Sequence, residues 1–467
     1  MLITFSVENF RSIRDLQTLS MAEPRLDHHL EWSNLIKVGS KRLVKTAALF
    51  GPNASGKSNV LRAMIWLRQF VLSSSKEGQV GEEIDAQPFR FSSAKENAPC
   101  HFEIEFFLDG FEYRYGCDVT AKQVESEWLF RKLPTAKPAM LFTREGKQFD
   151  ISPEFFKEGK GLEERTRENA LFLSVCAQFA GPEAAKIMGW MLRFRWVSGL
   201  SEAGFYAFTA QRLGEPGYRE KILELARKAD FNICDLRSEV EEMTEAKLPA
   251  DMPAKLRQQA LAQKWLRADI KTTHEKRDDE GKVVGRVEFD LGKDESQGTQ
   301  KFVALSGPIT YTLEQGSILV VDELEARLHP LLTQAVVDLF HSPVNRNNAQ
   351  LIFAAHDVTL LDPERFRRDQ VWFTEKDELG ASDLYSLAEF EPSQVRPGSK
   401  FSRQYLLGLL YAKAPLPCSI LRLQMNHCVP RLQAPGFSHL RAWSAGRSSG
   451  PLPARTGAVP AFGLPRA

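Results

Sequence analysis

The sequence predicts an α/β fold in which one core is assembled from both ends of the chain and is interrupted by two insertions. A short apolar run at 44 to 50 leads into a glycine-rich loop and then an amphipathic helix. Two further apolar strands follow far downstream, at 317 to 323 and at 350 to 357. Between these segments the apolar period changes first to two and then to that of a helix. This change predicts an inserted antiparallel β subdomain and a helical insertion.

Composition and charge are those of an ordinary folded protein. Apolar residues make up 43% and charged residues 26% of the 467 residues. The formal net charge of +1 gives no overall field that points to a nucleic-acid or membrane partner. The N-terminus reads as an alternating strand and not as a signal peptide, and no run is apolar enough to span a membrane. Six scattered cysteines without a CxxC pair argue against a zinc site or a disulfide framework. We therefore expect a cytoplasmic protein with no membrane partner.

Residues 1–155 are expected to hold the N-terminal part of the core and the antiparallel β subdomain. From about 84 to 152, apolar and polar residues alternate in segments such as "HFEIEFFLDGFEYRYGCDV". Asp109-Gly110 and Glu145-Gly146 interrupt the alternation as hairpin signals. The subdomain is therefore predicted to consist of hairpins inserted after the first helix.

Residues 156–280 are expected to form the helical insertion. Stretches such as "REKILELARKADF" and "AKLRQQALAQKWLRADI" are charged and amphipathic, and Pro249 and Pro253 interrupt them. A polar turn then precedes a predicted strand, "VVGRVEFDL". Residues 281–405 are expected to complete the core.

Residues 406–467 differ in composition from the rest of the chain. Beyond Glu391 there is no Asp or Glu, and the tail shows neither the helix nor the strand period. Two interpretations stay open: a disordered tail, and a reading frame disturbed near Leu410. We expect residues beyond about 414 to be mobile and protease-sensitive, and we draw no function from them.

The stretch "FGPNASGKSN" carries the first chemical motif. Its spacing is the P-loop pattern GxxxxGK[ST], placed between a buried strand and a helix, and this context disfavours a chance glycine-rich turn. The glycines let successive backbone N–H groups turn inward around a phosphate chain. Lys57 is expected to reach the β- and γ-phosphates of ATP, and the Ser58 hydroxyl to ligate Mg²⁺. The predicted nucleotide-binding residues of the loop are Gly51, Pro52, Asn53, Ala54, Ser55, Gly56, Lys57, Ser58 and Asn59.

The stretch "ILVVDE" supplies the partner motif. Four apolar residues deliver Asp322 to the carboxyl end of a strand, where it can hold Mg²⁺ through water. Glu323 follows at once and is placed to polarise an attacking water. An acidic turn after a buried strand is the alternative, which the nearby P-loop disfavours. The two motifs together predict an enzyme that hydrolyses a nucleotide.

Two weaker signals flank the acidic strand. Ser296 and Gly298 in "DESQGTQKF" are small residues that let a helix N-terminus approach a phosphate, although polar glycine turns are common. His356 ends the strand "LIFAAHD", where it could touch a γ-phosphate, although a lone histidine is more often structural. Because these residues lie before and after "ILVVDE" in the sequence, a role at the same site is favoured.

Together the stretches "FGPNASGKSN", "ESQGTQ", "ILVVDELEARLHP" and "LIFAAHD" resemble ABC-type ATPases of the SMC/RecF/OLD kind. Most narrowly they resemble the bacterial AAA-family ATP-binding proteins of abortive-infection and phage-defence systems, over roughly residues 1–405. The resemblance implies a P-loop NTPase fold with an ABC-ATPase-like head that hydrolyses ATP to ADP and phosphate. It also implies that Glu323 is the catalytic base and His356 the switch histidine. Ser296 and Gly298 would then be the signature residues that complete a partner subunit's site.

Other family features are less clear in this sequence. "LEARLHP" would be the D-loop region. Gln87 is one candidate for the Q-loop glutamine, and an ordinary exposed glutamine is an equally good interpretation. The family's usual C-terminal segment has a counterpart only at 454 to 460, within the atypical tail.

The resemblance implies an ATP-dependent molecular switch in which two copies sandwich two ATP molecules. Its output would go to an effector protein, a nuclease or a toxin, or to nucleic acid, in anti-phage defence or DNA repair. One alternative is the nucleotide-binding subunit of a membrane transporter. The long insertions between Lys57 and Ser296, and a signature other than LSGGQ, argue against it. The other alternative is a non-catalytic DNA-binding module clamped by ATP, from which DNA-responsive turnover would distinguish the switch.

Overall fold

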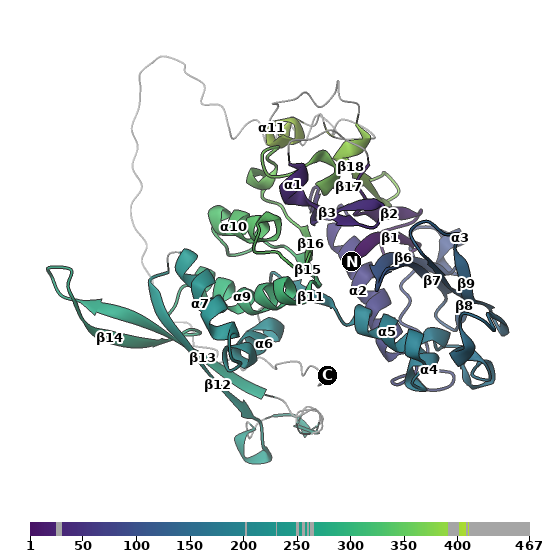
Figure 1. The fold of residues 1–467 in the computed structure, drawn as a ribbon, viewed down its shortest axis with the longest axis horizontal. Helices are drawn as coiled ribbons and strands as arrows, with labels where there is room; N and C mark the ends of the chain where they lie inside the picture. The colour runs from purple at the N-terminus through teal and green to yellow at the C-terminus, as the bar shows by residue number, and fades with distance from the viewer. Residues whose placement is uncertain are drawn as a thin grey trace, which may run out of the picture.

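A computed structural model of the chain describes residues 1–24, 30–200, 203–229, 231–248, 252–254, 257–258, 261, 266–390, 401–407 and 410. The predicted mobile tail beyond about 414 lies outside these residues. The described chain is built on two large sheets with helices between and around them (Figure 1).

The first sheet has six strands in the order β11-β15-β16-β5-β17-β18. Its strands are β5 (Thr46–Phe50), β11 (Phe194–Ser198), β15 (Ile318–Asp322), β16 (Gln350–Ala354), β17 (Val371–Lys376) and β18 (Ser382–Ser386). All neighbours pair in parallel except β18, which is antiparallel to β17 at the edge. Strand β5 lies between β16 and β17, so the prediction of one α/β core built from both ends of the chain is confirmed.

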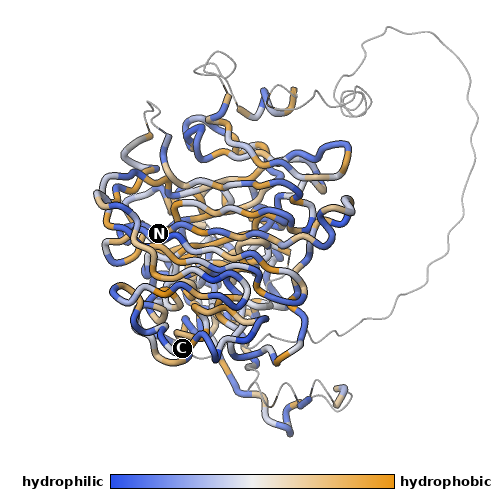
Figure 2. The backbone as a smooth tube through the Cα atoms, turned by 90° about the vertical axis from the view of Figure 1, so that its right-hand side faces the viewer, coloured by the Kyte–Doolittle hydropathy of each residue, from blue (hydrophilic) through white to orange (hydrophobic). Residues whose placement is uncertain are grey.

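The second sheet is antiparallel, with seven strands in the order β10-β9-β8-β7-β6-β1-β2. Its strands are β1 (Leu2–Glu8), β2 (Gln17–Ser20), β6 (Cys100–Leu108), β7 (Phe111–Val119), β8 (Val124–Lys132), β9 (Ala139–Glu145) and β10 (Gln148–Ile151). The predicted turn at Asp109-Gly110 joins β6 to β7, and both residues have positive φ, 49° and 87°, as a tight hairpin requires. Figure 2 faces this side of the molecule, where orange and blue alternate along the strands. The N-terminal strand β1 also belongs to this sheet, which the sequence did not indicate.

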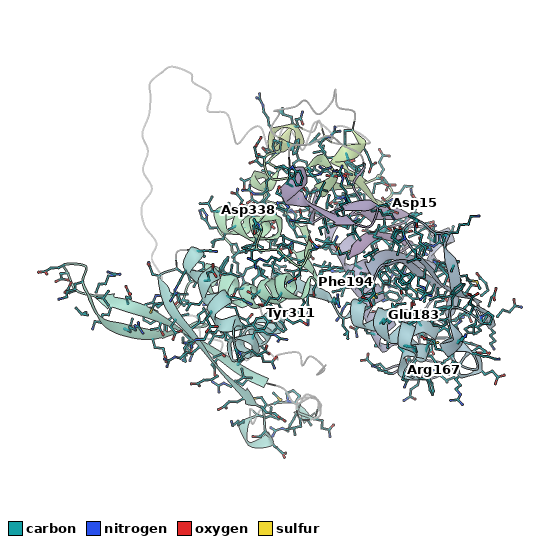
Figure 3. The ribbon with its side chains drawn as sticks, viewed as in Figure 1. Asp15, Arg167, Glu183, Phe194, Tyr311 and Asp338 are labelled. Atoms are coloured by element: carbon teal, nitrogen blue, oxygen red, sulfur yellow. The ribbon has the colours of Figure 1, made fainter. Side chains whose placement is uncertain are left out.

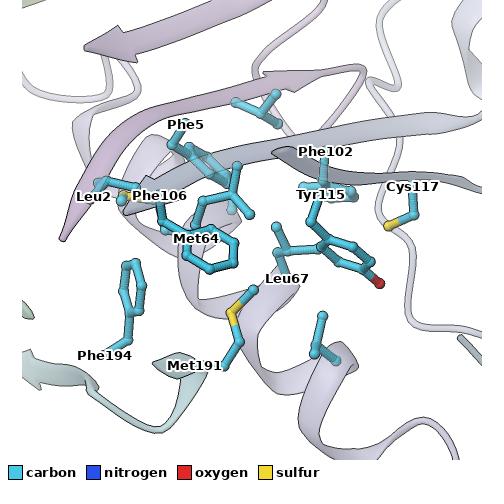
Figure 4. Packing of buried hydrophobic residues seen from close by; sticks show 14 of the residues in the cluster. Leu2, Phe5, Met64, Leu67, Phe102, Phe106, Tyr115, Cys117, Met191 and Phe194 are labelled. Carbon is cyan, nitrogen blue, oxygen red and sulfur yellow. The ribbon is translucent and has the colours of Figure 1, made fainter. Parts of the chain in front are cut away.

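Helix α2 (Lys57–Ser73) lies between the two sheets, and its buried face carries residues such as Leu61, Met64 and Leu67. These pack with Phe102 and Phe106 of the antiparallel sheet (Figure 4). Strand β15 contributes Ile318 and Val320 to this core, while the alternate residues Leu319 and Val321 join a second core on the opposite face. Because both faces of the parallel sheet are covered, its central strands β5, β15 and β16 are buried along their whole length.

The region predicted as a helical insertion is helical only in its first part. It holds α4 (Phe172–Gln178), α5 (Pro182–Met191), α6 (Ala203–Leu213) and α7 (Tyr218–Lys228), followed by β12 (Ile233–Glu242), β13 (Leu266–Arg277) and β14 (Val283–Asp290). The last three form a separate antiparallel sheet. The helical prediction is wrong for β12 and for the residues from 266. In β13, Ile270 and Thr272 are buried at a period of two, while charged neighbours mask that alternation. The strand predicted at "VVGRVEFDL" is present as β14.

The remaining α-helices and strands lie outside these three sheets, and β3 pairs with β4. They are α1 (Glu31–Asn34), β3 (Leu35–Val38), β4 (Lys41–Val44), α3 (Ser93–Glu96), α9 (Gln297–Gln315), α10 (Pro330–His341) and α11 (Phe401–Leu406). In Figure 3, Phe194 marks the place where α5 leads into the parallel sheet, and its ring meets that of Trp190 edge to face at 5.0 Å between centroids. No helix among the described residues has the length and apolar character needed to cross a bilayer.

Candidate nucleotide-binding site

The carboxyl ends of three adjacent parallel strands bring the predicted motifs together. The glycine-rich loop follows β5, the acidic pair Asp322 and Glu323 lies at the end of β15, and His356 follows β16. In open α/β sheets this edge is where ligands bind. The structure therefore places groups separated by some three hundred residues of sequence at one edge.

The glycines of the loop are required by close packing against the strands beside it. A Cβ added at Gly51, where φ is 154°, would lie 2.4 Å from the carbonyl oxygen of Thr374 in β17. At Gly56, where φ is 115°, it would lie 2.2 Å from the hydroxyl oxygen of Ser382 in β18. Only glycine lets the loop lie this close to both strands and adopt its turn. This shape is the cradle that the P-loop pattern predicts.

Lys57 is buried at the start of α2, with 5% of its surface exposed. Its ammonium donates to the carbonyl oxygens of Gly51 at 2.7 Å and Pro52 at 3.1 Å. Burial lowers the pKa of Lys57 to about 8, and the carboxylates of Glu325, Asp322 and Glu323 oppose that shift. The side chain thus holds a positive charge beside the loop, facing an acidic neighbourhood.

The two predicted Mg²⁺ ligands touch each other. The Ser58 hydroxyl donates to Oδ1 of Asp322 at 2.9 Å, across 264 positions of sequence. A hydroxyl and a carboxylate oxygen are the hard ligands that Mg²⁺ takes, together with water and phosphate oxygens. The residues present therefore fit Mg²⁺, and Ser58 and Asp322 would hold it.

Two residues predicted to bind nucleotide have side chains engaged elsewhere in the protein. The Ser55 hydroxyl is hydrogen-bonded to that of Thr374 at 2.5 Å. The amide of Asn59 donates to the Ser12 hydroxyl at 2.7 Å, and Ser382 also donates to Ser12, at 2.8 Å. These contacts anchor the loop and the start of α2 to the rest of the core. In this structure the side chains of Ser55 and Asn59 hold the loop in shape.

Glu323 has an unusual backbone, with φ at 55°, in the left-handed region that few non-glycine residues adopt. Gly199, just after β11, lies directly against it. The Gly199 N–H donates to the carbonyl oxygen of Asp322 at 2.6 Å, and an added Cβ would lie 1.8 Å from the Glu323 carbonyl oxygen. The residue that follows β11 thus packs directly against the backbone of Glu323.

Gly199→Ala should therefore displace Glu323. We expect turnover to fall at least about tenfold and stability to fall by about 1–3 kcal/mol, because the new methyl must push the backbone away. Gly189→Ala is the matched control, since a Cβ at Gly189 meets nothing within 4 Å. Phosphate release and thermal unfolding measure the two effects. Wild-type turnover in Gly199→Ala would show that this contact does not position Glu323.

The predicted signature turn begins α9. Ser296 is the N-cap of the helix, and its Oγ accepts the Thr299 N–H at 3.2 Å. A Cβ added at Gly298 would lie 3.2 Å from the carbonyl oxygen of Arg327, in the segment predicted as the D-loop. Ser296 is exposed, so the turn presents its hydroxyl and backbone on the surface.

A buried lysine joins the signature helix to the segment after the acidic pair. Lys301, in the second turn of α9, has no exposed surface, and its ammonium donates to the carbonyl oxygens of Leu324 at 3.2 Å and of Ala326. The signature turn and the chain following Glu323 are thus fixed relative to each other.

His356 is exposed at the end of β16, and its backbone N–H donates to Oε1 of Glu325 at 2.5 Å. Gln87, the Q-loop candidate, donates its side-chain amide to Asp85 at 3.0 Å, and its carbonyl oxygen accepts the N–H of Arg11. Gln87 therefore lies beside Arg11, close in sequence to Ser12, and its side chain is bound to the carboxylate of Asp85.

Several residues of the site carry no recognisable sequence motif. The residues around the loop and acidic strand that the sequence analysis missed are Ser12, Gly199, Glu325, Thr374 and Ser382. Only Glu325 had a signal, because it is the third acid in "DELE". The others are small residues whose roles depend on what packs against them.

The fold and the site together define a P-loop ATPase. Residues 47–362 match the family described as "AAA domain, putative AbiEii toxin, Type IV TA system", and the chain belongs to this family. This match confirms, at the level of the family, the resemblance to AAA-family and ABC-type ATPases that the motifs indicate. No curated protein matches the chain.

The solved structures that are similar to this chain share little sequence identity with it. The SMC head domain from Thermotoga maritima is 13% identical, with coverage of 82% of this chain and 98% of that chain and a TM-score of 0.37. An Smc head domain bound to the C-terminal domain of ScpA, from Pyrococcus furiosus, is 10% identical, with coverage of 82% and 96% and a TM-score of 0.34. The recombination mediator protein RecF is 13% identical, with coverage of 82% and 98% and a TM-score of 0.27.

Proposed function

We propose that this chain binds ATP with Mg²⁺ and hydrolyses it to ADP and phosphate. The observation that carries the proposal is the hydrogen bond between Ser58 and Asp322, which joins the phosphate-binding loop to the acidic strand end. Glu323 follows Asp322 directly, at the same edge of the sheet. A phosphate-binding loop, a Mg²⁺-ligand pair and an adjacent carboxylate are the parts that nucleotide hydrolysis needs.

Each side chain has a role that its position supports. Backbone N–H groups of the loop and the N-terminus of α2 bind the phosphates, and Lys57 exchanges its carbonyl partners for phosphate oxygens. Mg²⁺ held by Ser58 and Asp322 supplies positive charge to the phosphate oxygens. Glu323 orients the attacking water and accepts its proton. His356, exposed at the neighbouring strand end, contacts the terminal phosphate.

The proposal extends to a switch made of two copies. Ser296 and Gly298 form an exposed helix start fixed beside the segment that follows Glu323, which suits contact with a nucleotide on a second copy. ATP then favours the closed pair by mass action, and hydrolysis opens it. The family description names a putative toxin of a type IV toxin–antitoxin system. The role proposed for this chain is defence against phage, together with an effector protein. Nucleic acid is the alternative recipient of the output, and the setting proposed is the cytoplasm.

Lys57→Ala tests the nucleotide site directly. We expect the free energy of ATP binding to weaken by about 3 kcal/mol, roughly a hundredfold in Kd, because the charge-assisted contacts to the phosphates are lost. Turnover should be lost with binding. Calorimetry and phosphate release make the comparison, and Lys122→Ala, a change at an exposed lysine, is the control. Wild-type turnover in Lys57→Ala would refute the assignment of the loop.

ATP binding should weaken as the pH rises above about 8. The pKa of Lys57 is lowered to about 8 by burial, so at higher pH the free protein loses the charge that binds phosphate. Since ATP binds the charged form, affinity should be nearly full at about pH 7, fall to about half at pH 8, and fall by about a further fivefold between pH 8 and pH 9. Kd for a non-hydrolysable ATP analogue measures this. Lys57→Ala should show no such dependence, and a flat profile in the wild type would contradict the account.

A further inference from the structure

Glu325 lies two residues after the proposed base, and none of the roles above uses it. Its Oε1 accepts the backbone N–H of His356 at 2.5 Å. Its Oε2 is buried, and within the part of the chain that the structure describes no group donates a hydrogen bond to it. A buried carboxylate oxygen without a hydrogen-bond donor lowers the stability of the fold.

The contact occurs where the pairing of two strands ends. The N–H of Leu324 donates to the carbonyl oxygen of Ala354 at 3.2 Å, and the N–H of Ala355 donates to Leu49 of β5 at 3.0 Å. His356 is the next residue, and the Glu325 side chain accepts its N–H. The carboxylate thus links the chain after β15 to His356, two residues beyond the end of β16.

Beyond His356 the chain is held by a separate contact. The Asp357 side chain accepts the Thr359 N–H at 2.9 Å and so caps a short 3₁₀ turn. His356 is therefore a single exposed residue between a strand and a turn. Glu325 supplies the sideways contact that fixes its backbone relative to the acidic pair.

Glu325 also belongs electrostatically to the phosphate site. Among the three carboxylates that oppose the lowered pKa of Lys57, it has the strongest effect, ahead of Asp322 and Glu323. Its charge therefore lies near the phosphate-binding lysine as well as at the backbone of His356.

We propose that Glu325 is a positioning residue for hydrolysis, which holds the backbone of His356 so that the imidazole projects over the nucleotide site. This inference rests on the proposed ATPase function. Glu325 need not touch the nucleotide, because it acts through His356. Its loss should therefore affect the chemical step more than the binding of ATP.

The test measures kcat and KM for ATP in Glu325→Ala, Glu325→Gln, His356→Ala and the double variant Glu325→Ala/His356→Ala. Glu325→Ala should lower kcat by about tenfold to a hundredfold, with KM changed by less than about threefold, since a misplaced group costs rate. Glu325→Gln should recover most of the lost kcat, because its amide oxygen still accepts the His356 N–H. The double variant should be no slower than His356→Ala. Glu378→Ala, at an exposed carboxylate, is the surface control.

Glu325→Asp guards against a folding defect in Glu325→Ala. It keeps the charge but is one methylene too short to reach the His356 N–H, so it should be slower than Glu325→Gln. Turnover by Glu325→Asp equal to or above that of Glu325→Gln would overturn the proposal, because charge and not reach would then matter. Additive losses in the double variant would also overturn it. If wild type and Lys57→Ala show the same phosphate release, the ATPase function itself fails, and the inference fails with it.

Discussion

Glu323→Gln is expected to bind ATP and to hydrolyse it at least about a hundredfold more slowly than the wild type. The glutamine keeps the size and hydrogen-bonding reach of the side chain but cannot accept the proton of the attacking water. Ser58, Asp322 and Lys57 are unchanged, so the affinity for ATP with Mg²⁺ should stay close to that of the wild type. Phosphate release at saturating ATP and calorimetric Kd values separate the two effects.

Glu378→Gln makes the same change at an exposed carboxylate and should leave both quantities unaltered. If Glu323→Gln hydrolyses ATP at the wild-type rate, the base lies elsewhere. If it loses binding as well as turnover, Glu323 contributes to the nucleotide site itself, and the assigned role is wrong.

A mixture of Lys57→Ala and Ser296→Arg chains should regain ATPase activity that neither variant has alone. We propose that Lys57 serves the nucleotide on its own chain and that Ser296 serves the nucleotide on the other copy. In the mixed pair both lesions fall in one composite site, and the second site has an intact Lys57 and an intact Ser296. An equal mixture should then recover about one quarter of the wild-type activity, provided that one intact site is enough for turnover.

A second mixture provides the matched control. In the proposed switch Lys57 and Glu323 both act on the nucleotide of their own chain, so a mixed pair of Lys57→Ala and Glu323→Gln has one lesion in each site. This mixture should remain inactive. Equal recovery in both mixtures, or in neither, would contradict the division of the site between two copies.

The P-loop and acidic-strand motifs could be recognised in the sequence because nucleotide chemistry needs fixed residue types at fixed spacings. The spacing of Gly51, Gly56, Lys57 and Ser58 is that of the P-loop pattern, and the structure leaves no room for a Cβ at either glycine. The run "ILVVD" was predictable because both faces of β15 are buried, and a continuous apolar strand results.

Other parts depended on contacts that no local pattern contains. Gly199 matters because it lies against the Glu323 carbonyl, from a strand more than a hundred residues away. Strand β13 carries many charges and looked helical, yet pairing with β12 and β14 and burial of Ile270 make it a strand. Intrinsic preference was overridden there by tertiary packing.

Light scattering of Glu323→Gln with and without ATP and Mg²⁺ tests the central claim most directly. The variant should bind ATP without releasing it as ADP, so the closed pair should accumulate and the measured mass should double on addition of ATP. The double variant Glu323→Gln/Ser296→Arg should still bind ATP, but its mass should not double. A mass that stays the same with saturating ATP bound to Glu323→Gln would contradict the two-copy switch.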